Sequence, residues 1–187
     1  MGDLKIGLID ADRLDNKTRH PNLALMKISA YCKSIGYPGR LIFNVDELSN
    51  IGDYDVIIVS KVFTFTSLPE QLKKLIPDDV DGRKNLNRCI VDVMTHVEDY
   101  PSKPIIAIGG TGFFEDGGKD LHNSIEHIMP DYHLYDDFVE WMVNNKNVER
   151  KYFDDYENYS IGFITRGCFR QCPFCVNKIR PFQKVGP

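Results

Sequence analysis

The sequence predicts an α/β fold built on a doubly wound, mainly parallel sheet, and three observations support this. Short apolar runs alternate with segments of helical periodicity, which is the pattern of repeated βαβ units. The most apolar run, "YDVIIVSKVF" at 54–63, has the near-continuous hydrophobicity of a central parallel strand. Hydrophobic residues make up 42% of the 187 residues and charged residues 27%, a normal balance for a globular chain with a core.

Each expected strand is an apolar run bounded by polar residues or glycine. The expected strands cover 4–10, 39–45, 54–63, 103–112 and 159–167. The expected helices cover 22–37, 67–76, 83–100, 120–129 and 136–145. The helix at 83–100 has apolar residues at i, i+3, i+4, i+7, i+8 and i+11, and the one at 67–76 begins with a Ser followed by a Glu three residues on.

A polar stretch at 144–158 suggests a domain boundary. Residues 1–150 are expected to form the α/β domain, and residues 151–187 a linker and the start of a second domain. The charge also changes here, because residues 158–187 contain five basic residues and no acidic one, in a chain of net charge −4. A basic segment can bind nucleic acid or phosphate, or it can be a solvated loop.

The N-terminus has no signal peptide pattern, and no segment approaches the ~20 apolar residues of a membrane span. We therefore expect a cytoplasmic protein with no membrane partner. The chain has five cysteines. In a reducing compartment, an odd number of cysteines favours metal or redox chemistry over structural disulfides. Cys32 and Cys89 lie on apolar helical faces and are expected to be buried structural residues.

Three cysteines, Cys168, Cys172 and Cys175, fall within a short C-terminal stretch, "GCFRQCPFCVNK". Thiolates suit zinc, copper(I) or iron–sulfur clusters. A zinc site needs a fourth ligand, but no Cys or His follows Cys175 and the nearest upstream His is His133. A disulfide oxidoreductase would need a helix and several strands after "CPFC". A four-iron cluster held by three thiolates would keep one iron open for a substrate or cofactor.

The stretch "ITRGCFRQCPFC" resembles the cysteine motif of radical S-adenosylmethionine (SAM) enzymes, C-x3-C-x-aromatic-C, in members with an N-terminal cobalamin-binding-like domain. The resemblance implies that Cys168, Cys172 and Cys175 hold a [4Fe–4S] cluster whose open iron binds SAM. It places Phe174 near the SAM adenine. Reductive cleavage of SAM would then give a 5′-deoxyadenosyl radical that abstracts hydrogen from a substrate.

The same resemblance implies an external one-electron reductant of flavodoxin or ferredoxin type and an unknown substrate, and it makes nucleic acid an unlikely partner. Basic residues near the cysteines would favour thiolates and electron uptake. The family's later Gly-Gly-Glu stretch and most of its barrel are absent from these 187 residues. We therefore expect an N-terminal piece of a larger enzyme, inactive by itself. Two alternatives remain: a stand-alone cobalamin-like or nucleotide-binding module, and a zinc-stabilised interaction domain.

The glycine-rich run Gly109-Gly110-Thr111-Gly112 follows a predicted strand, at the position where open α/β sheets bind ligands. It is not a dinucleotide-binding G-x-G-x-x-G, and a tight turn would explain it equally well. By resemblance to cobalamin domains, Gly109, Gly110, Gly112 and Ser60 would line the nucleotide tail of the cofactor. The cobalt-binding signature Asp-x-His-x-x-Gly is absent, and His20 is expected to be a surface residue.

Overall fold

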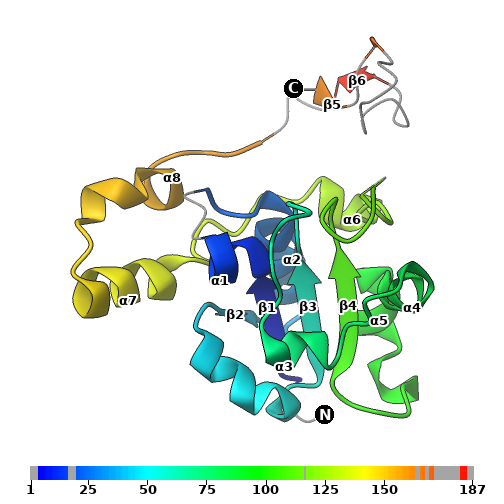
Figure 1. Ribbon diagram of the computed structural model, residues 1–187. Coiled ribbons are helices and arrows are strands. Elements are labelled where there is room, and N and C mark those ends of the chain that lie inside the picture. The colour runs from blue at the N-terminus through cyan, green and yellow to red at the C-terminus, as the bar shows by residue number, and fades with distance from the viewer. Residues whose placement is uncertain are drawn as a thin grey trace.

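Four parallel strands form the centre of the chain in the computed structural model, which describes residues 4–16, 20–115, 117–162, 165–166, 169–170 and 182–184 (Figure 1). The strand order is β2-β1-β3-β4. The strands are β1 (Ile6–Asp10), β2 (Gly39–Ile42), β3 (Val56–Ser60) and β4 (Ile105–Gly109). The predicted doubly wound, parallel α/β fold is therefore confirmed, and each of these strands lies within its predicted range.

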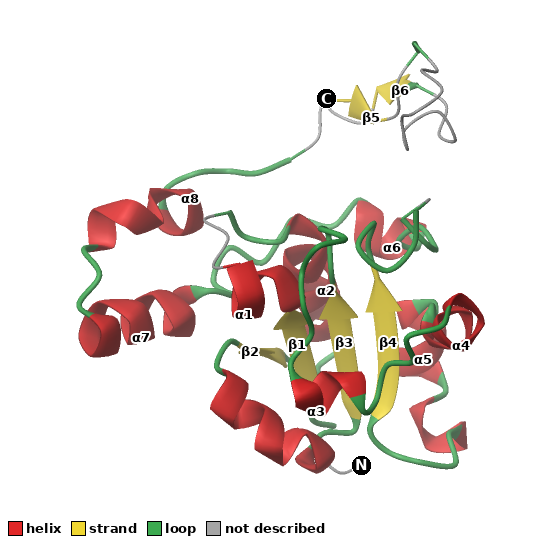
Figure 2. Cartoon of the chain, viewed as in Figure 1, coloured by secondary structure: helices red, strands yellow, loops and turns green. Residues whose placement is uncertain are grey.

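Helices cover both faces of the sheet because the strand side chains alternate in direction (Figure 2). In β3, Val56 and Ile58 join the core cluster on one face, whereas Ile57 and Val59 join the cluster on the other. The first face is covered by α2 (Leu23–Ser34), α5 (Ile90–Thr95), α6 (Asn123–Glu126) and α7 (Asp136–Lys146). The second is covered by the 3-10 helix η1 (Val45–Asp53) and by α3 (Glu70–Lys73).

The strand order places a topological switch between β1 and β3. From β1 the chain passes to β2 on one side, and it then returns to form β3 on the other. The register aligns Asp10 with Ser60, and Ser60 with Gly109, so the last residues of three strands lie in one row. In open parallel sheets, ligands bind in the crevice outside the carboxyl ends at such a switch point.

The single helix predicted over 83–100 is wrong, because the chain forms α4 (Val80–Leu86), α5 and the 3-10 helix η2 (Val97–Asp99). Leu86 packs against the core on one face of the sheet, whereas Ile90 belongs to the core on the other. A straight helix cannot reach both faces. The backbone amide of Lys119 donates a hydrogen bond to Asn87 Oδ1 at 3.1 Å, so a distant loop also holds the non-helical link.

Two helical segments were not predicted, namely α1 (Ala11–Asn16) and η1. The helix predicted at 67–76 starts later, with Pro69 and not Ser67 at its N-cap. Cys32 is fully buried in the core, as expected, whereas Cys89 is half-buried at the N-cap of α5. None of the helices in the described part of the chain has the length and apolarity to cross a membrane.

The segment that follows α7 contributes two more buried residues to the core. The 3-10 helix η3 (Arg150–Phe153) and α8 (Asp154–Glu157) place Phe153 and Tyr156 in the same cluster as Phe138 of α7. Further along, β5 (Thr165–Arg166) pairs antiparallel with β6 (Gln183–Lys184). Among the described residues of the strand predicted over 159–167, residues 165–166 form β5, and its partner β6 was not predicted.

Candidate functional site

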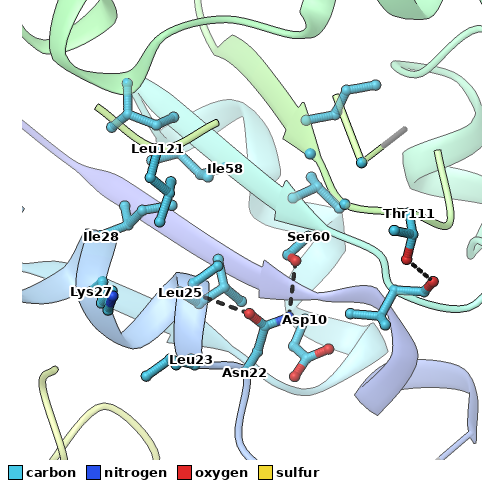
Figure 3. A pocket seen from close by; sticks show the side chains of 18 of the residues that line it. Asp10, Asn22, Leu23, Leu25, Lys27, Ile28, Ile58, Ser60, Thr111 and Leu121 are labelled. Atoms are coloured by element: carbon cyan, nitrogen blue, oxygen red, sulfur yellow. Dashed lines mark hydrogen bonds between the residues drawn. The ribbon is translucent and has the colours of Figure 1, made fainter. Parts of the chain in front are cut away.

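A cavity of about 720 Å³ lies at the carboxyl edge of the sheet, between β1, β3 and β4 and the helices α2 and α6 (Figure 3). This volume is typical of small-molecule sites. Its apolar lining includes Leu25, Ile28, Ile58, Ala107, Leu121 and Ile125. Its polar lining includes Asp10, Asn22, Ser60 and Thr111, which come from the ends of strands and helices. This lining suits a ligand with one apolar and one polar part.

A chain of hydrogen bonds joins the polar residues at the strand ends. The Tyr135 hydroxyl donates to Asp10 Oδ2 at 3.0 Å and accepts from the backbone amide of Asn22 at 2.9 Å. The Asn22 side-chain amide donates to Ser60 Oγ at 2.9 Å, while its oxygen caps α2 by accepting from the Leu25 amide. The N-terminus of α2 and the start of α7 are thus tied to the ends of β1 and β3.

Asp10 is the most perturbed carboxyl group in this network. Burial raises its pKa from an ordinary value of 3.8 to about 6, because a charged carboxylate loses water at this position. The hydrogen bond from Tyr135 lowers the pKa, the nearby Asp12 raises it, and Arg13 lowers it slightly. A carboxyl group in a cleft that titrates near neutrality can accept or donate a hydrogen bond to a ligand, depending on pH.

Arg13 connects this network to the segment after α7. Its guanidinium donates to the Tyr156 hydroxyl at 3.1 Å and lies 3.5 Å from the centroid of the Phe138 ring. Arg13 is buried, and that burial lowers its pKa. The guanidinium therefore has a structural role, joining α1 to α7 and α8.

The glycine-rich turn after β4 has two distinct parts. Gly109 and Gly110 line the cavity, and a Cβ atom on Gly109 would meet nothing within 4 Å. Gly110 has a φ of +105°, and its Cβ would lie 2.2 Å from the Lys61 carbonyl oxygen. Gly112 does not line the cavity, and its Cβ would meet Lys61 at 2.5 Å. Gly109 therefore leaves open space beside the cavity, whereas Gly110 and Gly112 allow the turn to approach the loop after β3.

Asp12 anchors that loop. The carboxylate is buried and accepts hydrogen bonds from the backbone amides of Val62, at 2.6 Å, and Phe63, at 3.1 Å, and from the Thr66 hydroxyl. When Asp10 is aligned with the first residue of Asp-x-His-x-x-Gly, Asp12 takes the place of the histidine. The signature has a cobalt ligand at this sequence position. In this chain the side-chain oxygens at the same position already accept hydrogen bonds from the loop.

His20 lies at the rim of the cavity with an exposed side chain, and its Nδ1 is 2.6 Å from Asp155 Oδ2. This agrees with the predicted surface position. In the described ranges, no group of three or more His, Cys, Asp or Glu side chains could hold a metal ion. Lys27 of α2, which lines the cavity, pairs with Glu126 of α6 at 3.0 Å.

The structure brings together Ser60, Gly109 and Gly110, which the sequence placed at a ligand site, but it leaves Gly112 outside the lining. The predicted cluster ligands Cys168, Cys172 and Cys175, and the predicted adenine neighbour Phe174, lie outside the described residues. Those four assignments remain predictions. Gly162, six residues before Cys168, lines the cavity.

Sequence reasoning missed Asp10, Asn22 and Tyr135. Asp10 carried a usable signal, since an acidic residue directly after an apolar run sits at the ligand-binding edge of a parallel sheet. Asn22 also carried one, as a helix N-cap residue before an apolar periodic segment. Tyr135 had no local signal, because it acts 125 residues away from Asp10.

Comparison with known proteins gives no match, since no protein-family model, curated protein or solved structure matches the chain. The fold and the site alone define its class. The described part of the chain is a Rossmann-like α/β domain with a ligand-sized cavity at the topological switch of its sheet.

Proposed function

We propose that this chain is the N-terminal part of a radical SAM enzyme, in which the α/β domain binds a cofactor next to the iron–sulfur segment. The observation that carries the proposal is the motif Cys168-x3-Cys172-x2-Cys175, with its Thr-Arg-Gly lead-in. These cysteines would hold a [4Fe–4S] cluster, with Phe174 beside the adenine of SAM. When bound, the cluster would supply an electron, received from a flavodoxin- or ferredoxin-type partner, for cleavage of SAM to methionine and a 5′-deoxyadenosyl radical.

The chain length between the cavity and the cysteines supports this arrangement. Gly162 lines the cavity and Cys168 follows six residues later. Because an extended chain spans at most ~3.6 Å per residue, a connection of this length cannot exceed roughly 22 Å. This short connection would allow a ligand in the cavity and a metal cluster on the cysteines to approach each other.

Cobalamin is the cofactor that we propose for the cavity, and its nucleotide tail fits the lining. The apolar part between Ile28, Ile58 and Leu121 would hold the aromatic base, and the polar strand ends would bind the ribose and phosphate. Gly109 leaves space for the tail, since a side chain there would project into open space beside the cavity. Asp12 would not be a cobalt ligand, because both of its carboxylate oxygens accept hydrogen bonds from the loop after β3.

Iron and sulfide reconstitution under anaerobic conditions tests the cluster. We expect about four irons and four sulfides per chain, as for a [4Fe–4S] site, and loss of both in Cys172→Ala. Cys89→Ala is the matched control, because Cys89 lies outside the motif, and it should keep the full iron content. Stoichiometric zinc without iron uptake would contradict the proposal and favour the zinc-stabilised domain.

Titration with cobalamin, followed by absorbance, tests the cofactor of the α/β domain. We expect saturable binding that is weakened by Gly109→Val, since the new side chain would fill the open space beside the cavity that we assign to the tail. Iron uptake with no cobalamin binding would keep the radical SAM proposal and remove cobalamin from it. Cobalamin binding with no iron uptake would favour a stand-alone binding module.

A further inference from the structure

The loop after β3 exposes an unusual pair of aromatic side chains at the mouth of the cavity. Phe63 and Phe65 stack with ring centroids 5.2 Å apart and an interplanar angle of 17°. Their exposed fractions are 42% and 71%, and that of the adjacent Val62 is 44%. Val62 and Phe63 also line the cavity, so this apolar surface is continuous with it.

This loop is held rigidly from two sides. Asp12 accepts hydrogen bonds from the amides of Val62 and Phe63, as described above. On the other side, the Thr111 hydroxyl donates to the Val62 carbonyl at 2.6 Å, and the Gly112 amide donates to the Lys61 carbonyl at 2.9 Å. These hydrogen bonds anchor the backbone of residues 61–63, from which the stacked pair of rings begins.

We infer that residues 62–65 form a preformed platform on which a flat conjugated ring of the cavity's ligand stacks, and that Asp12 is its positioning residue. Stacked aromatic faces bind other flat rings by dispersion and by burial of apolar area. A contiguous apolar surface beside a cavity marks a binding surface. The ligand is favoured over a protein partner because Phe63 belongs to both the cavity lining and the exposed pair.

The inference rests on the proposed function, in which the flat ring is the corrin of cobalamin. An outer face of the Phe63–Phe65 stack would then contact the macrocycle, and the second ring would support the first from behind. Asp12 would shape that contact indirectly, through the loop backbone, without touching the ring's metal. In this arrangement the tail of the ligand lies in the cavity and its ring lies on the platform. Probes that contain only the ring or only the tail therefore test the two parts of the site separately.

The test measures the affinity of the full chain for three probes: cobalamin, cobinamide, which has the ring without the nucleotide tail, and α-ribazole, which has the tail base and sugar without the ring. We expect Phe63→Ala and Phe65→Ala each to weaken cobalamin and cobinamide binding about tenfold, as the loss of one stacking contact does, and to leave α-ribazole binding unchanged. Tyr152→Ala, which truncates an exposed aromatic residue outside the cavity lining, is the control and should change none of the three.

Asp12→Asn should behave like the phenylalanine variants in this assay. It replaces one carboxylate oxygen by an amide that cannot accept hydrogen bonds from the loop. A merely structural role would weaken ring and tail probes alike, whereas a positioning role weakens only the two ring-containing probes. Unchanged ring affinity in both phenylalanine variants, or equal loss of ring and tail affinity, would overturn the inference.

A fourth probe, haemin, separates this inference from the proposed function. If the wild-type chain binds neither cobalamin nor cobinamide, the cobalamin proposal fails, and haemin then decides on the platform. Haemin binding that is weakened tenfold by Phe65→Ala keeps the platform as a site for another flat macrocycle. The platform would be overturned if haemin does not bind, or if its affinity is the same for the wild type and Phe65→Ala. It would also be overturned if sedimentation shows self-association that depends on Phe65.

Discussion

Asp10 illustrates how one buried side chain links pH, stability and the cavity. It ends β1, lies almost fully buried, and accepts a hydrogen bond from Tyr135. Burial raises its pKa to about 6, so the folded chain binds this proton more tightly than the unfolded chain does. Between about pH 4 and pH 6 the folded state therefore holds more protons, and the free energy of unfolding falls as the pH rises.

Asp10→Asn should remove this dependence. From pKa values of 3.8 and about 6, the Asp10 contribution destabilises the wild type by about 2 kcal/mol more at pH 7.5 than at pH 4.5. The variant should thus gain about that much relative to the wild type between the two pH values. Urea unfolding followed by fluorescence of Trp141, the single tryptophan, measures it. If the difference in unfolding free energy between Asp10→Asn and the wild type does not change with pH, the raised pKa of Asp10 is contradicted.

Two neighbouring glycines should respond differently to the same substitution. Gly110→Ala should cost about 3 kcal/mol of unfolding free energy, because φ is +105° and the new Cβ would lie 2.2 Å from the Lys61 carbonyl oxygen. Gly109→Ala is the matched control and should cost less than about 1 kcal/mol, since its Cβ meets nothing within 4 Å. Equal losses in thermal or urea unfolding would show that the turn is not packed as described.

Among the elements, α7 is held at its N-terminal end by polar contacts as well as by packing. Tyr135, its N-cap residue, bonds both Asp10 of β1 and the backbone of Asn22 before α2. Phe138, in the first turn, packs edge-on against Phe153 at a centroid distance of 5.8 Å. The position of α7 therefore depends on the state of the strand ends that form the cavity.

Tyr135→Phe should destabilise the chain by about 1–3 kcal/mol, because it leaves the buried Asp10 carboxyl group and the half-buried Asn22 amide without their shared partner. Unfolding free energies from urea titration give the value. Tyr159→Phe, at an exposed tyrosine, should change stability by less than about 0.5 kcal/mol. A loss for Tyr135→Phe no larger than that for Tyr159→Phe would mean that packing alone fixes α7.

At the scale of the whole molecule, the two core clusters define how far the folded unit extends. Both consist of residues between Leu4 and Tyr156, and they include Phe153 and Tyr156. The predicted domain boundary near residue 150 stays a prediction. The buried aromatic residues after it belong to the same core as the sheet.

Truncation should distinguish these limits. A chain ending at residue 158 should unfold cooperatively in urea, with a free energy close to that of the full chain. A chain ending at residue 150 should lose at least about 3 kcal/mol, because it lacks two buried aromatic side chains and exposes their contacts with Arg13 and Phe138. Equal stability of the two truncated chains would place the end of the folded unit at residue 150.

The sequence alone predicted the four parallel strands, the helices α2 and α7, the position of Ser60 and Gly109 at a ligand edge, and a three-cysteine motif. These features are local, because an apolar run, an amphipathic period or a ligand spacing is complete within a few residues. The break in the helix between Leu86 and Ile90 could not be predicted from local sequence. It depends on which face of the sheet each of these residues covers.

Only the tertiary structure decided which polar groups meet. The pairing register brings Asp10, Ser60 and Gly109 into one row, and Tyr135 reaches Asp10 from 125 residues away. No periodicity encodes such a contact, because it arises when parallel strands end at one edge and a distant helix docks against them. The role of Asp12 could not be predicted from the sequence for the same reason. Its carboxylate holds the loop that carries Phe63 and Phe65, and that loop lies about 50 residues further along the chain.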